Sequence, residues 1–254
     1  MKVHSKIYGH GEPMIILHGL FGMLDNWKSI ATHFSKNFEV HLIDQRNHGL
    51  SPHSRDFSYQ HMSDDLLEYM DERRLGPAVL MGHSMGGKTA MTFATQNGEH
   101  VDRLIVVDIA PKYYPVHHRG IINALLSVDL EQNRTRREVE LLLEKSIPDF
   151  GVRQFLLKNL YWEEKDKLGW RFNLPVLNDL IENVGEALPE GSSFEGSALF
   201  MSGGRSNYIT KDDHELIYEH FPRAEFVVIK KAGHWLHAEA PAEFIDAVED
   251  YLSF

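Results

Sequence analysis

The sequence predicts an α/β fold in which helices flank both faces of a mostly parallel central sheet. Short apolar segments typical of buried strands alternate with helical periodicity over residues 3–110 and again over residues 194–254. Several apolar segments are continuous, as expected of strands that are covered on both faces. The 254 residues are enough for one large domain with a sizeable insertion.

Strand and helix alternate through the first half of the chain. Strands are expected at residues 3–8, 13–17, 38–43, 79–81 and 103–107. Helices are expected at residues 27–34, 63–74 and 88–94. Near the end, strands are expected at residues 197–201 and 225–230, and helices at residues 212–220 and 241–252. This order favours parallel strands in one sheet.

Residues 111–193 interrupt the alternation. Helical periodicity is evident at residues 135–147, 152–161 and 175–184, and no strand is expected in this segment. Because alternation resumes afterwards, we expect an insertion that lies across the sheet. The predicted organisation is a core of residues 1–110 and 194–254 and a helical cap of residues 111–193.

The composition argues against several classes of function. With 43% hydrophobic and 25% charged residues, the chain has the composition of a soluble globular protein. Its net charge of −11 argues against nucleic acid as a partner, since phosphate binding needs a basic surface. It has no cysteine, which excludes a disulfide, a thiolate metal site and a cysteine nucleophile. No signal peptide or membrane span is recognisable, so we expect a cytoplasmic protein without a membrane partner.

The segment around Ser84 has the pattern of a nucleophile elbow. An apolar run at residues 79–81 leads to Gly82, and Ser84 and Gly86 follow at the spacing G-x-S-x-G. In this strand-to-helix turn the serine hydroxyl projects clear of the sheet, and the residues two before and two after it must be small. Gly82 and Gly86 meet that requirement, so Ser84 is the candidate nucleophile.

The same segment also fits a phosphate-binding loop. Residues 82–89 satisfy G-x-x-x-x-G-K-[ST], and the apolar run ending at Asp108 is similar to a magnesium-binding strand, so an NTPase is an alternative hypothesis. Against it, a phosphate loop usually follows the first strand of its fold, whereas expected strands precede this one. We expect Lys88 to be a solvated or cap-facing side chain. A non-catalytic binding protein, with an ordinary serine at position 84, is the other alternative.

Other strand ends supply partners for Ser84. In open α/β sheets, ligand-handling residues lie beyond the carboxyl ends of the strands. Asp108 follows one expected strand, and His234 follows the last one, directly after Gly233. A serine becomes nucleophilic when an imidazole accepts its proton, and a carboxylate fixes the tautomer of that imidazole. We therefore expect Ser84, His234 and Asp108 to meet at one edge of the sheet.

An oxyanion hole needs two preorganised N–H donors for the tetrahedral intermediate. We expect one donor from Met85, the residue after the nucleophile. We expect the other from Leu20, in the turn that follows the second strand. His237, three residues after His234, is expected to pack or hydrogen-bond locally.

Four segments resemble the cap-bearing α/β-hydrolases: HGLFG at 18–22, DQRNHGLS at 44–51, GHSMGG at 82–87 and GHW at 233–235. Ser84, Asp108 and His234 also follow the chain order of that superfamily. RNHG at 46–49, VDIAP at 107–111 and WRFN at 170–173 are most similar to the YbfF-type esterases. The resemblance covers nearly the whole chain. It implies an α/β-hydrolase fold, a helical cap over the site, and carboxylic-ester hydrolysis with some thioesterase activity.

One position departs from the resemblance. Most of these hydrolases carry their acid in a G-x-x-D turn after the penultimate strand, and here that turn, residues 204–207, ends in Asn207. A neutral amide cannot stabilise an imidazolium as a carboxylate does. Asp108 is therefore the preferred acid. Asp212 is the alternative, although an aspartate at the start of a helix commonly acts as a cap.

The predicted function is a serine carboxylesterase that hydrolyses short- to medium-chain esters, or acyl thioesters, through an acyl-enzyme. Its partner is then a small-molecule substrate, and no metal or organic cofactor is implied. Phe21, Trp162 and Trp170 are expected to line the acyl pocket. The fit of the cap over the site is expected to set the preferred acyl length.

Overall fold

The computed structural model describes residues 1–116, 118–132, 135–165 and 167–253. Within these residues a seven-stranded sheet has the strand order β1-β3-β2-β4-β5-β8-β9. The strands are β1 (Ser5–Gly9), β2 (Glu12–Leu17), β3 (Phe38–Ile43), β4 (Ala78–His83), β5 (Val101–Val107), β8 (Ser197–Gly203) and β9 (Ala224–Ile229). In this sheet the edge strand β1 pairs antiparallel with β3, and the other pairs are parallel. The predicted mostly parallel sheet is confirmed.

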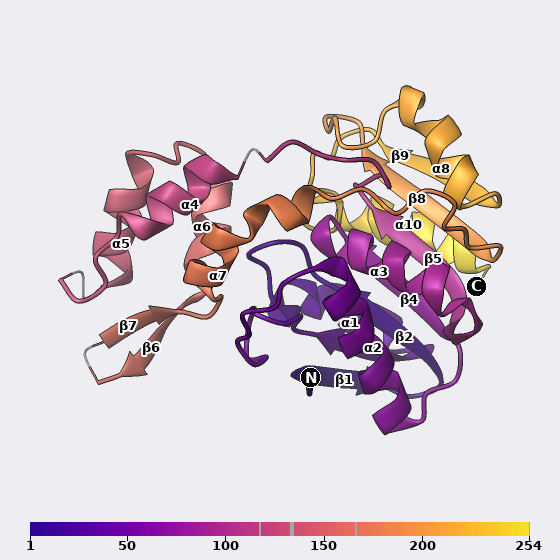
Figure 1. The fold of residues 1–254 in the computed structure, drawn as a ribbon, viewed down its shortest axis with the longest axis horizontal. Coiled ribbons are helices and arrows are strands. Elements are labelled where there is room, and N and C mark those ends of the chain that lie inside the picture. Colours follow the sequence, from indigo (N-terminus) through magenta and orange to yellow (C-terminus); the bar gives the residue numbers. More distant parts are fainter. Residues whose placement is uncertain (117, 133–134, 166, 254) are drawn as a thin grey trace.

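Helices cover both faces of this sheet (Figure 1). One face packs against α2 (Tyr59–Arg73), α3 (Met85–Gln96) and α8 (His214–His220), and the other against α1 (Lys28–Phe34) and α10 (Pro241–Leu252). Successive strand residues face opposite sides, so Ile15 joins the first apolar cluster and Ile16 the second. Short elements complete this part: η1 (Leu24–Trp27), η2 (Gly98–His100), η4 (Lys211–Asp213) and α9 (Leu236–Glu239).

The elements between β5 and β8 gather beside the sheet and form the cap, at the left in Figure 1. They are α4 (Arg119–Leu126), α5 (Arg136–Glu144), α6 (Phe150–Leu157), β6 (Leu160–Glu164), β7 (Lys167–Trp170), α7 (Leu174–Asp179) and η3 (Ile181–Gly185). Their buried apolar side chains form one cluster with Leu20, Phe21 and Met85 of the core. The cap therefore packs directly onto the turn after β2 and the start of α3.

The expectation of a cap without strands is wrong. β6 and β7 pair antiparallel, with Leu160 opposite Trp170 and Tyr161 opposite Gly169. Aromatic residues favour strands, and both strands carry them. The strands are only five and four residues long, too short for a clear alternating pattern. The helix expected at residues 152–161 also ends earlier than predicted. α6 stops at Leu157, and β6 begins at Leu160.

Two connectors join the cap to the core, residues 111–116 and 185–188. They run side by side, because Tyr114 N–H donates to the Gly185 carbonyl at 2.8 Å and Leu188 N–H to the Pro111 carbonyl at 2.9 Å. The cap thus leaves and re-enters the core at one place.

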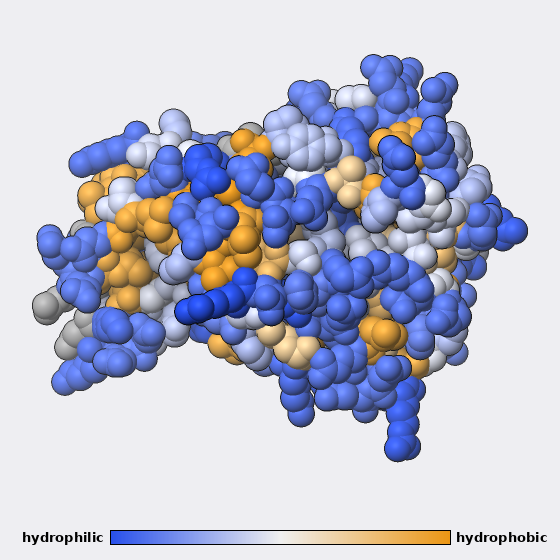
Figure 2. All heavy atoms as spheres, in the orientation of Figure 1, coloured by the Kyte–Doolittle hydropathy of each residue, from blue (hydrophilic) through white to orange (hydrophobic). Residues whose placement is uncertain are grey.

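The surface differs between the two parts. Figure 2 shows mainly hydrophilic side chains over the core and a larger apolar area over the cap. Large apolar side chains exposed in the cap include Leu126, Leu141, Phe150 and Trp162. None of the helices in the described residues combines the length and the hydropathy that crossing a bilayer requires.

Candidate active site

Ser84 occupies a strained turn between β4 and α3. Its φ of 52° and ψ of −117° lie outside the common regions for a residue with a side chain. A Cβ on Gly82 would come within 2.1 Å of the Gly86 carbonyl oxygen, and one on Gly86 within 2.4 Å of the Leu17 carbonyl oxygen. Both flanking positions therefore require glycine, as the elbow pattern predicts.

Asp108 and His234 are joined directly. Asp108 Oδ2 lies 2.7 Å from His234 Nδ1, and the carboxylate is fully buried. Asp108 follows β5 with a φ of 53°, and its Oδ1 accepts the Gly203 N–H at 3.1 Å. Ser206 Oγ donates to Oδ2. With Nδ1 bound to a carboxylate, Nε2 of His234 is left as the basic nitrogen.

Asp212 does not take this position. It lies exposed in η4, and its carboxylate makes no hydrogen bond or ion pair within the described part of the chain. Its neighbour Asp213 instead accepts from Thr210 and pairs with Lys112 at 2.7 Å. Ser206, directly before Asn207, is the residue of the G-x-x-N turn that reaches Asp108.

Ser84 and His234 line the same cavity, of about 520 Å³, between the strand ends and α6. No hydrogen bond joins the Ser84 hydroxyl to His234 within the described residues. Catalytic hydrogen bonds of this kind are often long in a free enzyme and shorten when substrate binds. The structure therefore brings the candidate nucleophile, base and acid to one edge of the sheet, with the acid–base contact already formed.

Neighbouring rings hold His234 in place. Tyr208 stacks on its imidazole at a centroid distance of 4.1 Å, and burial raises the pKa of that phenol to about 12. His83 Nε2 meets the His234 carbonyl at 2.8 Å. Burial lowers the pKa of His83 well below its usual value, so it is neutral and can donate one ring N–H here. His237 is buried and its ring stacks on Trp27 at a centroid distance of 3.8 Å; it packs, but against a residue remote in sequence, and it also lines the cavity.

Of the two expected oxyanion donors, Leu20 lies in the turn after β2 and Met85 lies at the start of α3. Neither the Leu20 N–H nor the Met85 N–H has a hydrogen-bond partner in the ranges that the structure describes. Gly22 N–H donates back to the Gly19 carbonyl at 2.9 Å, which closes the turn. Phe21 adopts a φ of 58° and donates its N–H to His48 Nε2 at 3.2 Å.

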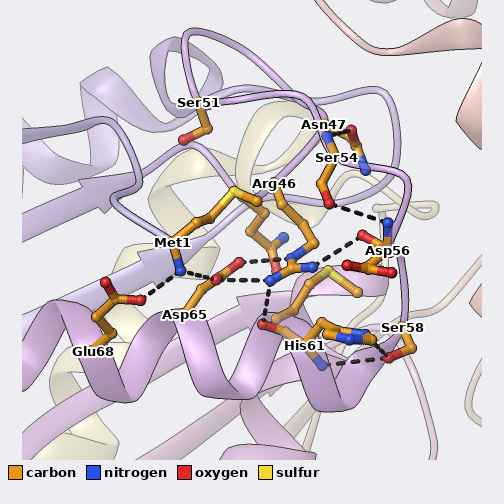
Figure 3. Close-up of polar contacts among 12 residues, drawn as sticks. Met1, Arg46, Asn47, Ser51, Ser54, Asp56, Ser58, His61, Asp65 and Glu68 are labelled. Atoms are coloured by element: carbon orange, nitrogen blue, oxygen red, sulfur yellow. Dashed lines mark hydrogen bonds and ion pairs between the residues drawn. The ribbon is translucent and has the colours of Figure 1, made fainter.

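His48 lies in a hydrogen-bonded loop after β3. Its Nδ1 meets the Arg46 carbonyl at 3.0 Å, and burial lowers its pKa to about 3, so Nε2 remains an acceptor. Arg46 forms a buried bidentate pair with Asp65 of α2, at 2.7 and 2.8 Å (Figure 3). A Cβ on Gly49, with a φ of 57°, would collide with the Asp44 carboxylate. The DQRNHG segment therefore supports the turn after β2.

The expected pocket residues divide into two groups. Phe21 lines the cavity, whereas Trp162 is 56% exposed on β6 and Trp170 stacks on Phe172, and neither Trp162 nor Trp170 reaches the cavity. Trp235 and Phe155, 5.7 Å apart between ring centroids, line it instead. The position of Trp235 next to His234 in the sequence is the signal from which this role could be predicted.

Lys88 is not available to bind phosphate. It is fully buried, so the expectation of a solvated side chain is wrong and the cap-facing one is correct. Its ammonium donates to the carbonyls of Lys112 at 2.5 Å and Glu186 at 2.6 Å, one from each connector. Burial lowers the pKa of Lys88 to about 7. A phosphate loop needs this amine to be free, so the NTPase hypothesis is not favoured.

Within the described ranges, no group of three or more His, Cys, Asp or Glu side chains is arranged to hold a metal ion.

Known proteins match both the sequence and the fold. Residues 12–150 match the model of the alpha/beta hydrolase fold family. The chain is 40% identical to the sn-1-specific diacylglycerol lipase ABHD11 of Danio rerio, over 96% of this chain and 79% of that protein. It is 35% identical to the esterase YbfF of Escherichia coli K12, over 96% and 94% of the two chains. The solved structure of a marine microorganism esterase superposes with a TM-score of 0.97, at 42% identity over 99% of both chains.

Proposed function

We propose that this chain, which belongs to the alpha/beta hydrolase fold family, is a serine ester hydrolase. The observation that carries the proposal is the 2.7 Å contact from His234 to the buried Asp108 carboxylate, in the cavity that Ser84 also lines. A serine elbow alone occurs in many contexts. A serine elbow beside an imidazole already paired with a carboxylate has the parts that acyl transfer requires.

In the proposed mechanism, His234 Nε2 takes the proton from the Ser84 hydroxyl as the oxygen attacks the acyl carbon. Asp108 holds the ring in the Nδ1–H tautomer and stabilises the imidazolium. The N–H groups of Leu20 and Met85 bind the oxyanion. His234 then gives its proton to the leaving alcohol. In the second half, His234 takes a proton from water as the water attacks the acyl carbon, and returns that proton to the Ser84 oxygen as the carboxylic acid leaves.

The proposed substrates are small-molecule carboxylic esters with short to medium acyl chains, and acyl thioesters of similar size. Apolar side chains that line the cavity support this substrate class, among them Leu20, Phe21, Phe155 and Trp235. Relatives named as an esterase and a diacylglycerol lipase also support ester hydrolysis. Residues 111–193 serve as the substrate-facing cap in this proposal, and the cytoplasmic location stays a prediction from the sequence.

The test is steady-state hydrolysis of p-nitrophenyl esters and acyl thioesters of graded chain length. We expect turnover by the unchanged chain and a loss of about 10⁴-fold or more in kcat/KM on Ser84→Ala. A Ser84→Ala variant that retains turnover contradicts the mechanism. A folded chain that binds esters without hydrolysing any of them indicates a binding protein instead. Saturable ATP binding that disappears on Lys88→Met would support the NTPase.

A further inference from the structure

A series of hydrogen-bonded backbone amides leads from the cap to Leu20. The Leu20 N–H shares a peptide unit with the Gly19 carbonyl, which accepts the Gly22 N–H at 2.9 Å. The Gly22 N–H shares a peptide unit with the Phe21 carbonyl, which accepts Asn159 Nδ2 at 2.8 Å. Two peptide units therefore connect a cap side chain to a proposed oxyanion donor.

The direction of the Leu20 N–H follows from this series. A peptide unit is planar and trans, so its carbonyl and its N–H point in opposite directions. The Gly19 carbonyl is held by Gly22 and also by His18 Nδ1 at 2.9 Å. His18 Nε2 accepts the Gln45 N–H, which leaves the proton on Nδ1 as donor to Gly19. These two donors fix the direction of the Gly19 carbonyl, and they therefore also fix the Leu20 N–H, which points the opposite way.

Asn159 is well placed to act on this series. It follows α6 and is 1% exposed, its carbonyl accepts the Arg171 N–H at 2.9 Å, and its Nδ2 also lies 3.3 Å from the Leu156 carbonyl. Its Oδ1 is buried and has no hydrogen-bond partner within the described residues. An unpaired buried acceptor costs stability, so Oδ1 does not explain an asparagine here. The favourable interaction of this side chain is the hydrogen bond that Nδ2 donates to the Phe21 carbonyl.

Phe21 needs this support because its backbone is strained. Its φ of 58° belongs to the left-handed region, which disfavours residues with a side chain. His48 binds its N–H, Asn159 binds its carbonyl, and Phe172 of the cap contacts its ring at a centroid distance of 5.3 Å. Two of these three restraints come from the cap.

We propose that Asn159 is a positioning residue that couples the seating of the cap to the oxyanion hole. The inference rests on the proposed function, because it takes Leu20 as an oxyanion donor. Hydrogen bonds in series polarise one another, so the Asn159 donor strengthens the Leu20 N–H at the far end of the series. Negative charge develops at that end during acyl transfer, and the effect therefore falls on the transition state. A cap that is displaced removes this first donor.

Two variants of Asn159 and one matched control test the inference. Asn159→Leu removes the donor together with the unpaired acceptor and keeps a similar volume. Asn159→Asp keeps the shape but sets an acceptor against the Phe21 carbonyl. The control is Asn183→Leu, because Asn183 Nδ2 donates to the Phe57 carbonyl at 2.7 Å and also joins the cap to the core. That carbonyl does not lead to Gly19.

The measurements are kcat and KM for a short aryl ester and the inhibition constant of an aryl trifluoromethyl ketone. This ketone adds to the serine and forms a tetrahedral oxyanion. Both Asn159 variants are expected to lower kcat about tenfold, with KM changed less than about threefold, since the loss is confined to oxyanion binding. The inhibition constant is expected to rise by the same factor as kcat/KM falls. Asn183→Leu should leave all three values within about threefold.

The outcomes separate this inference from the proposed function. If Ser84-dependent turnover is present and Asn159→Leu keeps the kcat of the unchanged chain, the inference is wrong and the function stands. A lower kcat with an unchanged inhibition constant also overturns the inference, because it indicates a general structural defect. If Asn159→Leu does not fold, Asn159→Asp is judged by the same criteria. If the unchanged chain shows no Ser84-dependent turnover, the proposed function fails and the inference falls with it.

Discussion

The core and the cap contribute to the same cavity by different means. In the core, Ser84, Asp108 and His234 follow β4, β5 and β9, and the hydrogen bonds of the sheet hold these strand ends in register. The cap supplies residues of α6 to the cavity, and it meets the core through an apolar cluster and side-chain hydrogen bonds such as those of Asn159 and Asn183. The sheet therefore fixes the positions of the three core side chains, whereas the positions of the α6 side chains depend on how the cap packs on the core.

This difference indicates which changes each part tolerates. The proposed chemistry needs sub-ångström placement, which a hydrogen-bonded sheet provides. Selection of an acyl group needs only a suitable apolar wall, which helices of varied sequence can provide. Substitutions at strand ends should therefore affect every substrate alike, whereas substitutions in the cap should affect some substrates more than others.

The largest expected effect tests the core directly. Asp108→Asn removes the charge that fixes the His234 tautomer, and we expect kcat/KM to fall about 10³- to 10⁴-fold for all acyl lengths. Asp212→Asn is the matched control and should stay within about twofold, since Asp212 is exposed and the His234 ring pairs with Asp108. Ester hydrolysis across graded chain lengths measures both. The reverse result would move the acid to Asp212.

A second prediction concerns the attachment of the cap. Burial lowers the pKa of Lys88 to about 7 in the folded chain, against an ordinary value of 10.5. Between these values the unfolded chain binds more protons, so stability from this group rises with pH. The unfolding free energy of the unchanged chain minus that of Lys88→Met should therefore increase from pH 7 to pH 10, by on the order of a few kcal/mol.

Chemical denaturation at several pH values measures this difference. A difference that is flat, or that decreases with pH, indicates that Lys88 stays charged between the two connectors. In that case the cap is attached by a buried cation, and the connectors should separate only when the core unfolds.

The smallest expected effect distinguishes a core tryptophan, Trp235, from a cap tryptophan, Trp162. Trp235 lines the cavity beside Phe155, and Trp235→Ala should shift the preferred acyl length and change kcat/KM about three- to tenfold for the longer esters. Trp162 is exposed on β6, so Trp162→Ala should change no ester by more than about twofold. Equal effects of the two substitutions would place the acyl group against the hairpin instead of against α6.

Much of the core could be predicted from the sequence because local patterns determine it. Continuous apolar runs marked β2, β4 and β5, and the residues at their ends, Ser84 and Asp108, followed from the rule for strand ends. Local pattern did not decide which of two carboxylates, Asp108 or Asp212, pairs with His234. Their choice depends on which carboxylate the fold brings to His234, and only the three-dimensional structure contains that information.

The cap and the supports of the site were less predictable because their contacts are remote in sequence. The β6–β7 hairpin has strands too short for a periodic signal. Asn159 lies 138 residues from Phe21, and no pattern around it distinguishes it from a surface asparagine. Lys88 matched a phosphate-loop motif, yet its surroundings in the fold are two backbone carbonyls. In each case the role of the residue depends on the group that it contacts in the fold, and the neighbouring sequence does not identify that group.

The adjacent connectors have a consequence for how such an enzyme could diversify. Since Tyr114 and Gly185 are hydrogen-bonded neighbours, the cap occupies a loop whose two ends already touch. A replacement of any length could start and finish there without stretching β5 or β8. Grafting a foreign cap between these two points is therefore a practical route to new ester preferences, provided that the graft restores an amide donor to the Phe21 carbonyl.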